Sequence, residues 1–106
     1  MTTLELLKAA RALISDPAHW TQRAFGRDAA GRPVITGRSA QAVCWCAAGA
    51  IQHVTADYRQ EARVLDALAG DASLGLIGDT NDWGGHPAVL ALYDAAIARL
   101  ESEAAA

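Results

Sequence analysis

Residues 42–54, AVCWCAAGAIQHV, combine two cysteines and a tryptophan with a run of alanines and one glycine. Alanine is the strongest helix former, and its small side chain allows neighbouring elements to come close. We therefore expect a thin helix over residues 40–55, capped by Ser39. Its expected buried face consists of Val43, Ala47, Ala50, Ile51 and Val54. Gly49 costs about 1 kcal/mol relative to alanine inside a helix, so its presence indicates that a neighbouring backbone packs against this face.

Apolar residues at helical spacing predict three further helices. Thr2 and Glu5 form a capping-box pattern at the start of the first helix, and Gly70 is placed to end the second. The third has the most regular apolar stripe in the chain. The expected ranges are 3–14, 58–69 and 86–101, followed by a frayed tail over residues 102–106.

A turn and a glycine-rich stretch separate these helices. Asp28 and Gly31 occupy the first and fourth positions of a type I turn, which predicts a hairpin with strands 21–27 and 32–35. An isolated hairpin is marginal in water, so we expect it to lie on the helices. Residues 71–85 contain four glycines and are predicted to form a long loop. Loops of that length often carry function.

The length and the order of these elements predict one compact domain over residues 1–101. Its expected class is α+β and mostly helical, with about four helices in an antiparallel cluster and one small two-stranded hairpin. The N-terminal segment carries charges every few residues, and no apolar run approaches the ~20 residues of a membrane span. We therefore expect a cytoplasmic protein with reduced thiols and no membrane contact.

The net charge of −3 is unevenly distributed. Residues 1–56 hold six basic against three acidic side chains, whereas residues 57–106 hold three against nine. The basic excess lies at Arg23, Arg27, Arg32 and Arg38. Arg23, Arg27 and Arg32 are predicted to form a binding surface, unless these arginines face the acidic half of the same protein. The acidic balance of the whole chain argues against a nucleic-acid partner.

The cysteines leave two alternatives. On a helix, Cys44 and Cys46 diverge by about 200°, so neither a shared disulfide nor a shared metal is expected. Metal-binding spacings such as CxxC are absent, and we predict neither a metal nor a cofactor. Cys46 and His86, with Asn81 or Asp82 to orient the imidazole, would supply the residue types of a thiol-nucleophile site. Buried cysteine more often acts as a small hydrophobic residue, and we favour that role, which leaves no catalytic residue.

The segment GDTNDWGGHP is the second candidate binding region. It gathers Asn81, Asp82, Trp83 and His86 next to the start of the last helix. Helix N-termini favour anions, but the local aspartates would repel one, so a neutral or cationic ligand is expected. Alternatively, these side chains only tie the loop to itself through Asx-type hydrogen bonds.

Two segments together carry a resemblance. The run WCAAGAI at residues 45–51, followed by Asn81-Asp82, His86 and the stretch Tyr93–Ile97, resembles a family of short bacterial and phage proteins known only as a domain of unknown function. The N-terminal helix leading into HWTQRAFGRDAAGRPV is similar too, so the likeness spans most of the chain. The resemblance implies that the Cys46 helix and the Asn-Asp…His loop form one structural unit. It implies no reaction.

Two functions remain. The first is a small non-enzymatic binding module, phage- or defence-related, acting on a protein partner. The second is a hydrolase or transferase that uses Cys46 and His86. The enzyme requires the Cys46 sulfur within about 4 Å of a His86 nitrogen in an open pocket. The module requires an exposed patch and a sheltered Cys46.

Overall fold

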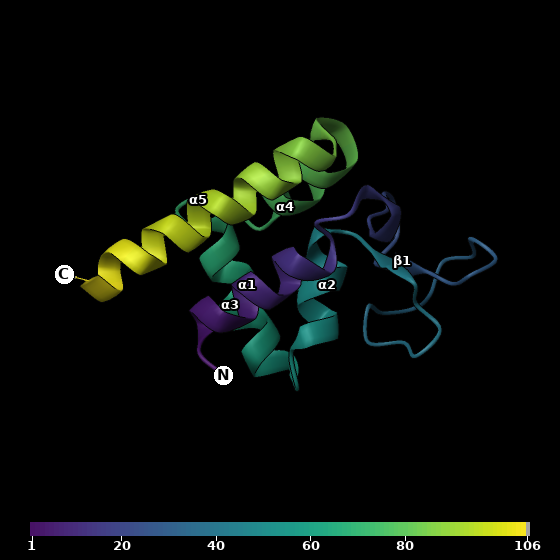
Figure 1. Cartoon of the computed structure of the whole chain (residues 1–106), viewed down its shortest axis with the longest axis horizontal. Helices are drawn as coiled ribbons and strands as arrows, with labels where there is room; N and C mark the ends of the chain where they lie inside the picture. Colours follow the sequence, from purple (N-terminus) through teal and green to yellow (C-terminus); the bar gives the residue numbers. More distant parts are fainter. Residues whose placement is uncertain (106) are drawn as a thin grey trace.

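The computed structural model describes residues 1–105 and contains five α-helices, two single helical turns and one small sheet (Figure 1). The elements are α1 (Thr3–Leu13), η1 (Pro17–His19), β1 (Gly26–Arg27), β2 (Cys44–Trp45), α2 (Ala47–Val54), α3 (Tyr58–Ala69), α4 (Gly75–Asp79), η2 (Thr80–Gly84) and α5 (His86–Ala105). β1 and β2 pair in antiparallel fashion. The predicted α+β, mostly helical class is confirmed, with five helices in place of about four.

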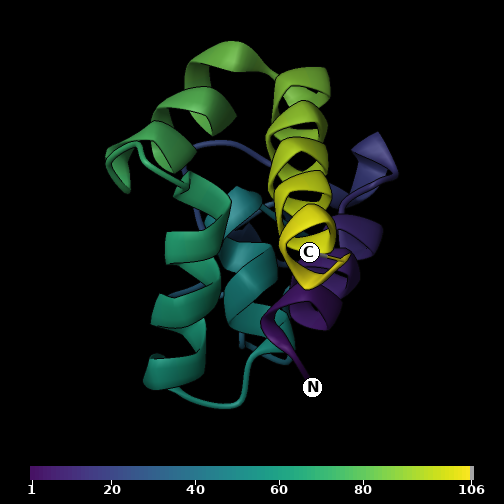
Figure 2. The ribbon, with the colours of Figure 1, turned by 90° about the vertical axis from the view of Figure 1, so that its left-hand side faces the viewer.

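The helix α2 lies in the middle of the fold and contacts α1, α3 and α4, while α5 packs against α1 and α3 (Figures 1 and 2). The fully buried hydrophobic side chains come from all four longer helical segments: Leu6, Leu7, Ala10, Ile14, Ala47, Ala50, Ile51, Val64, Leu68, Val89, Tyr93 and Ala96. The hydroxyl of Tyr93 donates a hydrogen bond to the carbonyl oxygen of Ala47 at 2.6 Å. The only polar atom of this large buried side chain is therefore satisfied.

Local hydrogen bonds and one glycine set the ends of α1 and α3. Thr2 and Glu5 form the reciprocal capping box of α1. The carboxylate of Asp57 accepts the backbone N–H of Gln60 at the start of α3. Gly70 ends α3 with a φ of 63°, a left-handed conformation that glycine adopts without a steric penalty.

The prediction of a helix over residues 40–55 is wrong in its first half. The helix α2 begins at Ala47, and its N-cap is Cys46, not Ser39. Residues 44 and 45 are extended because they pair with β1, and the indole Nε1 of Trp45 donates to the carbonyl oxygen of Gly37 at 3.0 Å. A helix through this region would lose both sets of contacts. Val43, predicted to be buried, is 47% exposed.

The turn from Asp28 to Gly31 forms as predicted, with the Gly31 N–H donating to the Asp28 carbonyl oxygen at 2.9 Å. Arg27 makes a single bridge to Pro33, but the regular partner of β1 is β2 rather than residues 32–35. The chain between the two strands forms an extension beyond the helices, seen near the β1 label in Figure 1. We call residues 28–43 the β1–β2 lobe.

Two further segments differ from the prediction. Residues 71–85 are not one long loop, because α4 and the π-helical turn η2 occupy residues 75–84. Residues 102–105 are helical and belong to α5 rather than to a frayed tail. Ala106 lies outside the described residues. None of the helices described has both the length and the apolar character needed to cross a bilayer.

Gly49 has the close backbone neighbour that its place in a helix indicates. A Cβ atom at Gly49 would overlap the carbonyl oxygen of Phe25, and one at Gly37 would overlap the carbonyl oxygen of Gly49. The side-chain oxygen of Gln52 also accepts the Gly37 N–H at 2.8 Å. The backbones of Gly37, in the β1–β2 lobe, and of Phe25, just before β1, therefore lie directly against α2 and leave no room for a side chain at Gly37 or Gly49.

Candidate functional site

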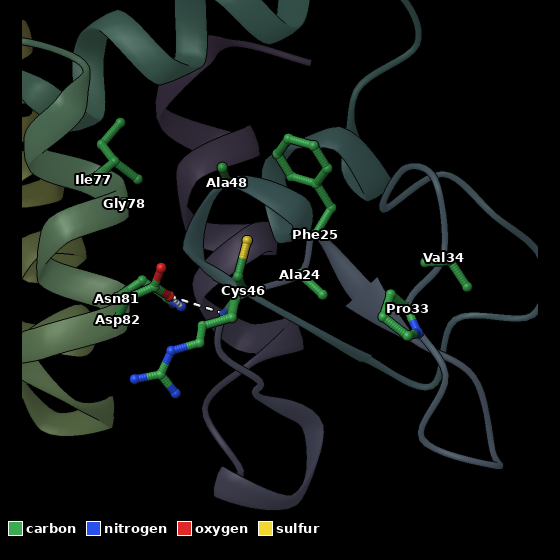
Figure 3. Close-up of a pocket in the computed structure, with 11 residues that line it drawn as sticks. Ala24, Phe25, Pro33, Val34, Cys46, Ala48, Ile77, Gly78, Asn81 and Asp82 are labelled. Atoms are coloured by element: carbon green, nitrogen blue, oxygen red, sulfur yellow. Dashed lines mark hydrogen bonds between the residues drawn. The ribbon is translucent and has the colours of Figure 1, made fainter.

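A pocket of about 570 Å³ lies beside the N-terminus of α2, between residues 23–34 and the α4–η2 segment (Figure 3). Its lining is mainly apolar, with a few polar groups: Arg23, Ala24, Phe25, Pro33, Val34, Cys46, Ala48, Ile77, Gly78, Asn81 and Asp82. The volume suits a large side chain or a small organic group. The pocket brings together the two regions that the sequence indicated separately, the arginine-bearing segment and the Asn-Asp segment.

Cys46 lines this pocket. Figure 3 shows its sulfur with Asn81 and Asp82 on one side and Phe25 on the other. The sulfur accepts the N–H of Gly49 at 3.2 Å, which makes Cys46 the N-cap of α2. Burial raises the pKa of the Cys46 thiol above its ordinary value of 9.0, and the negative charge of Asp82 adds to the shift, whereas the Gly49 amide opposes it. The thiol is therefore neutral at pH 7.

Asn81 is the structural centre of the site and is only 2% exposed. Its Oδ1 accepts hydrogen bonds from the indole Nε1 of Trp20 at 2.7 Å and from the backbone N–H of Ala47 at 2.9 Å. Its Nδ2 donates to the Thr21 carbonyl oxygen at 3.0 Å and to the carboxylate of Asp82 at 3.1 Å. One amide group thus joins η2, the segment after α1 and the first residue of α2.

Asp82, Arg23 and Trp83 form the polar edge of the site. The Oδ1 atom of Asp82 accepts the backbone N–H of Arg23 at 3.0 Å. Arg23 has a φ of 61°, the only positive φ of a non-glycine residue among the residues described. Its guanidinium carbon lies 5.5 Å from the ring centroid of Trp83, a side chain that is 79% exposed.

The side chain of His86 contacts the end of α1 and does not line the pocket. Its Nε2 lies 2.7 Å from the carbonyl oxygen of Ile14. A carbonyl oxygen only accepts, so Nε2 carries the proton in this bond. The imidazole also packs against Trp20, with ring centroids 5.3 Å apart. No histidine is among the described residues that line the pocket, so the Cys46–His86 pair is not brought together there.

Arg23 is the only one of the candidate arginines that lines the pocket. The guanidinium of Arg27 donates to the Thr21 hydroxyl and to the carbonyl oxygens of Gln22 and Gly31, which holds the base of the lobe. Arg32 pairs with Asp28 at 3.1 Å. Arg38 pairs with Glu61 at 2.9 Å, so this arginine does face the acidic half of the chain.

The apolar lining of the pocket was not predicted. Phe25 and Ile77 lie more than fifty positions apart in the sequence, and the chain offers no periodic signal that would pair them. Phe25 is 44% exposed, but this does not mark a binding site by itself, because single exposed apolar side chains are common on protein surfaces. Within residues 1–105, no three His, Cys, Asp or Glu side chains gather in a geometry suited to a metal ion.

Comparison with known proteins identifies a family. No curated protein and no solved structure matches the chain. A family model, described as a family of unknown function (DUF6197), matches residues 1–99. That match includes α1, both strands, every residue of the pocket and most of α5. The chain therefore belongs to the DUF6197 family.

Proposed function

We propose that this protein is a non-enzymatic binding module that takes an apolar side chain of a protein partner into the pocket beside α2. The observation that carries the proposal is the pocket itself, because it joins an apolar cavity of about 570 Å³ to an edge holding Arg23 and Trp83. Arginine and tryptophan are enriched among the residues that dominate binding energies at protein interfaces. An anchor side chain that enters a cavity beside such residues is a common mode of protein recognition.

The state of Cys46 supports binding over thiol chemistry. A nucleophilic cysteine needs a thiolate, and burial together with the Asp82 charge raises the pKa of this thiol. His86, the base that the alternative requires, donates from Nε2 to the Ile14 carbonyl oxygen. In the proposed module, the Cys46 sulfur contributes a polarisable wall of the cavity and caps α2.

The wider setting follows from the resemblance to short bacterial and phage proteins. Within this proposal the module acts in the cytoplasm on a macromolecular partner, in a phage- or defence-related role. The exposed side chains of Phe25 and Trp83 give the partner further contact area around the cavity.

The proposal is tested by filling the cavity. Ala48 lines the pocket in the first turn of α2, so Ala48→Trp, or Ala48→Leu if the larger side chain lowers the melting temperature, occupies the space meant for the partner. Ala98→Trp, at an exposed position on α5, is the matched control. We expect the Ala48 variant to lose a protein that the wild type and the control both retain from an extract of the source cell. Equal capture by all three chains would contradict the proposal.

The thiol alternative has its own test. Rapid alkylation of Cys46 at pH 7, abolished by His86→Ala, would replace the binding module with an enzyme. We expect slow alkylation that the His86 substitution does not slow further.

A further inference from the structure

We propose that the segment bound in this pocket is acidic: a large apolar side chain enters the cavity, and an Asp or Glu next to it pairs with Arg23. This inference rests on the proposed binding function and names the chemistry of the partner. It reverses the expectation from the Asn-Asp segment alone, which favoured a neutral or cationic ligand.

The first observation is the free charge of Arg23. Among the residues described, Arg23 is one of five arginines with no carboxylate within ion-pairing distance of the guanidinium, and the others are Arg27, Arg59, Arg63 and Arg99. Arg23 also lines the pocket, so its charge lies at the cavity that the partner's apolar group would enter. A carboxylate carried by the partner would supply the missing counter-charge.

The second observation is the backbone of Arg23. A non-glycine residue in the left-handed region is strained and persists only where its surroundings hold it. Here the Arg23 N–H is held by the Oδ1 atom of Asp82 at 3.0 Å. Strain of this kind concentrates at binding sites, and at this position it places the guanidinium beside the indole of Trp83.

The third observation is the electrostatic balance around the cavity. The N-terminus of α2 borders the pocket through Cys46 and Ala48, and a helix N-terminus carries a partial positive charge. The opposing charge is that of Asp82, and its Oδ1 atom already accepts two hydrogen bonds, from the Arg23 N–H and the Asn81 amide. Arg23 and the helix end together favour an anionic group over a cationic one.

The stacked arrangement also fits a carboxylate in shape. A guanidinium that lies over an aromatic ring keeps the N–H groups at its edge available, and these match the two oxygens of a carboxylate. The exposed Trp83 then supplies apolar surface that the neighbouring part of the peptide covers. Recognition therefore combines one anchor in the cavity with one ion pair at its edge.

The test uses a library of random twelve-residue peptides displayed on phage and selected on the immobilised full chain. Four chains are compared: wild type, Arg23→Gln, Ala48→Trp and the control Arg63→Gln, which neutralises an exposed arginine on α3. We expect wild type and control to enrich peptides that carry a large apolar residue beside Asp or Glu. We expect Arg23→Gln to bind the same synthetic peptides about tenfold more weakly and to select apolar residues without the acid.

The outcomes separate the two proposals. Enrichment of apolar peptides with neutral or basic neighbours on the wild type would overturn the acidic preference while leaving the binding module in place. An acidic preference that survives Arg23→Gln, or that Arg63→Gln also removes, would overturn the role of Arg23. Failure of the wild type to enrich any sequence beyond the level of Ala48→Trp would overturn the binding module itself.

Discussion

The Oδ1 atom of Asn81 accepts the backbone N–H of Ala47 at 2.9 Å, so a side chain from η2 satisfies the first helical amide of α2. The N–H groups in the first turn of a helix have no partner within the helix, and a side chain close in sequence normally satisfies one of them. In α2 the sulfur of Cys46 takes the Gly49 amide, and Asn81, from a distant part of the chain, takes that of Ala47. The start of α2 is therefore fixed by a local cap and a tertiary contact together.

Replacing Asn81 by leucine removes this connection while keeping the number and branching of the side-chain heavy atoms. The part-buried indole N–H of Trp20 and the buried N–H of Ala47 both lose their acceptor, and a buried donor left unsatisfied costs about 1–3 kcal/mol. We expect the free energy of unfolding to fall by at least about 2 kcal/mol in urea titrations. Adding Trp20→Phe to Asn81→Leu removes one of the stranded donors, so the double variant should lose less than the sum of the two single variants. An Asn81→Leu protein as stable as wild type would contradict the central role of this amide.

Gly49→Ala tests the close approach of the Phe25 backbone to α2. The new Cβ atom would overlap the carbonyl oxygen of Phe25, and because that oxygen belongs to the backbone, the segment just before β1 must shift to make room. We expect a loss of about 2 kcal/mol or more. Gly78→Ala is the matched control, because a Cβ at Gly78 meets no atom within 4 Å and α4 gains a better helix former. Thermal denaturation should show a large decrease in melting temperature for Gly49→Ala and no decrease for Gly78→Ala.

The stability of the protein should fall in alkaline solution. Burial raises the pKa of Cys46 above 9.0 and that of Tyr93 well above 10.0, so each group holds its proton more tightly in the folded chain. As the pH rises past these ordinary values, the unfolded chain loses its protons first and unfolding becomes more favourable. The stabilisation is complete below about pH 9 and decreases above it.

Urea titrations between pH 8 and pH 10 measure this effect. Cys46→Ala should give a flatter dependence near pH 9 than wild type, even though loss of the cap lowers its stability at every pH. Identical slopes for the two proteins would show that the thiol titrates alike in the folded and unfolded chains.

Arg38→Gln and Arg32→Gln remove the same charge from two different environments. The Arg38–Glu61 pair is largely buried, with side-chain exposures of 27% and 14%, and Arg38 also donates to the Thr55 hydroxyl at 3.0 Å. We expect Arg38→Gln to cost about 1–3 kcal/mol. Arg32 is 79% exposed beside Asp28, and its loss should change stability by less than about 0.5 kcal/mol. Similar losses for both variants would contradict the anchoring role of Arg38.

Local rules predicted the helices whose ends are set by neighbouring residues. The capping box of Thr2 and Glu5 and the left-handed Gly70 marked α1 and α3 within a residue or two, because short-range bonds decide those ends. The small face of α2 was also interpreted correctly at Gly49, since only a close backbone explains a glycine there.

The same local rules predicted the wrong start for α2. Alanine-rich sequence favours helix from residue 40 onward, but the sheet pairing of Cys44 and Trp45 and the buried indole bond to Gly37 keep that part extended. This placement also moves Cys46 from the middle of a helix to its cap, at the edge of a cavity. The pocket could not be foreseen for a similar reason, because Phe25 and Ile77 line the same pocket only once α4 has packed against α2.

The two walls of the cavity come from opposite halves of the chain, residues 23–34 and 77–82, and the cavity exists only while both are docked. Occupancy and folding are therefore thermodynamically linked: a ligand at one hundred times its dissociation constant adds about 2.7 kcal/mol to the free energy of unfolding. A ligand that fills the cavity should therefore raise the melting temperature. Cleavage of the chain between α2 and α4 would abolish the site once the two fragments separate, even where both keep their helices.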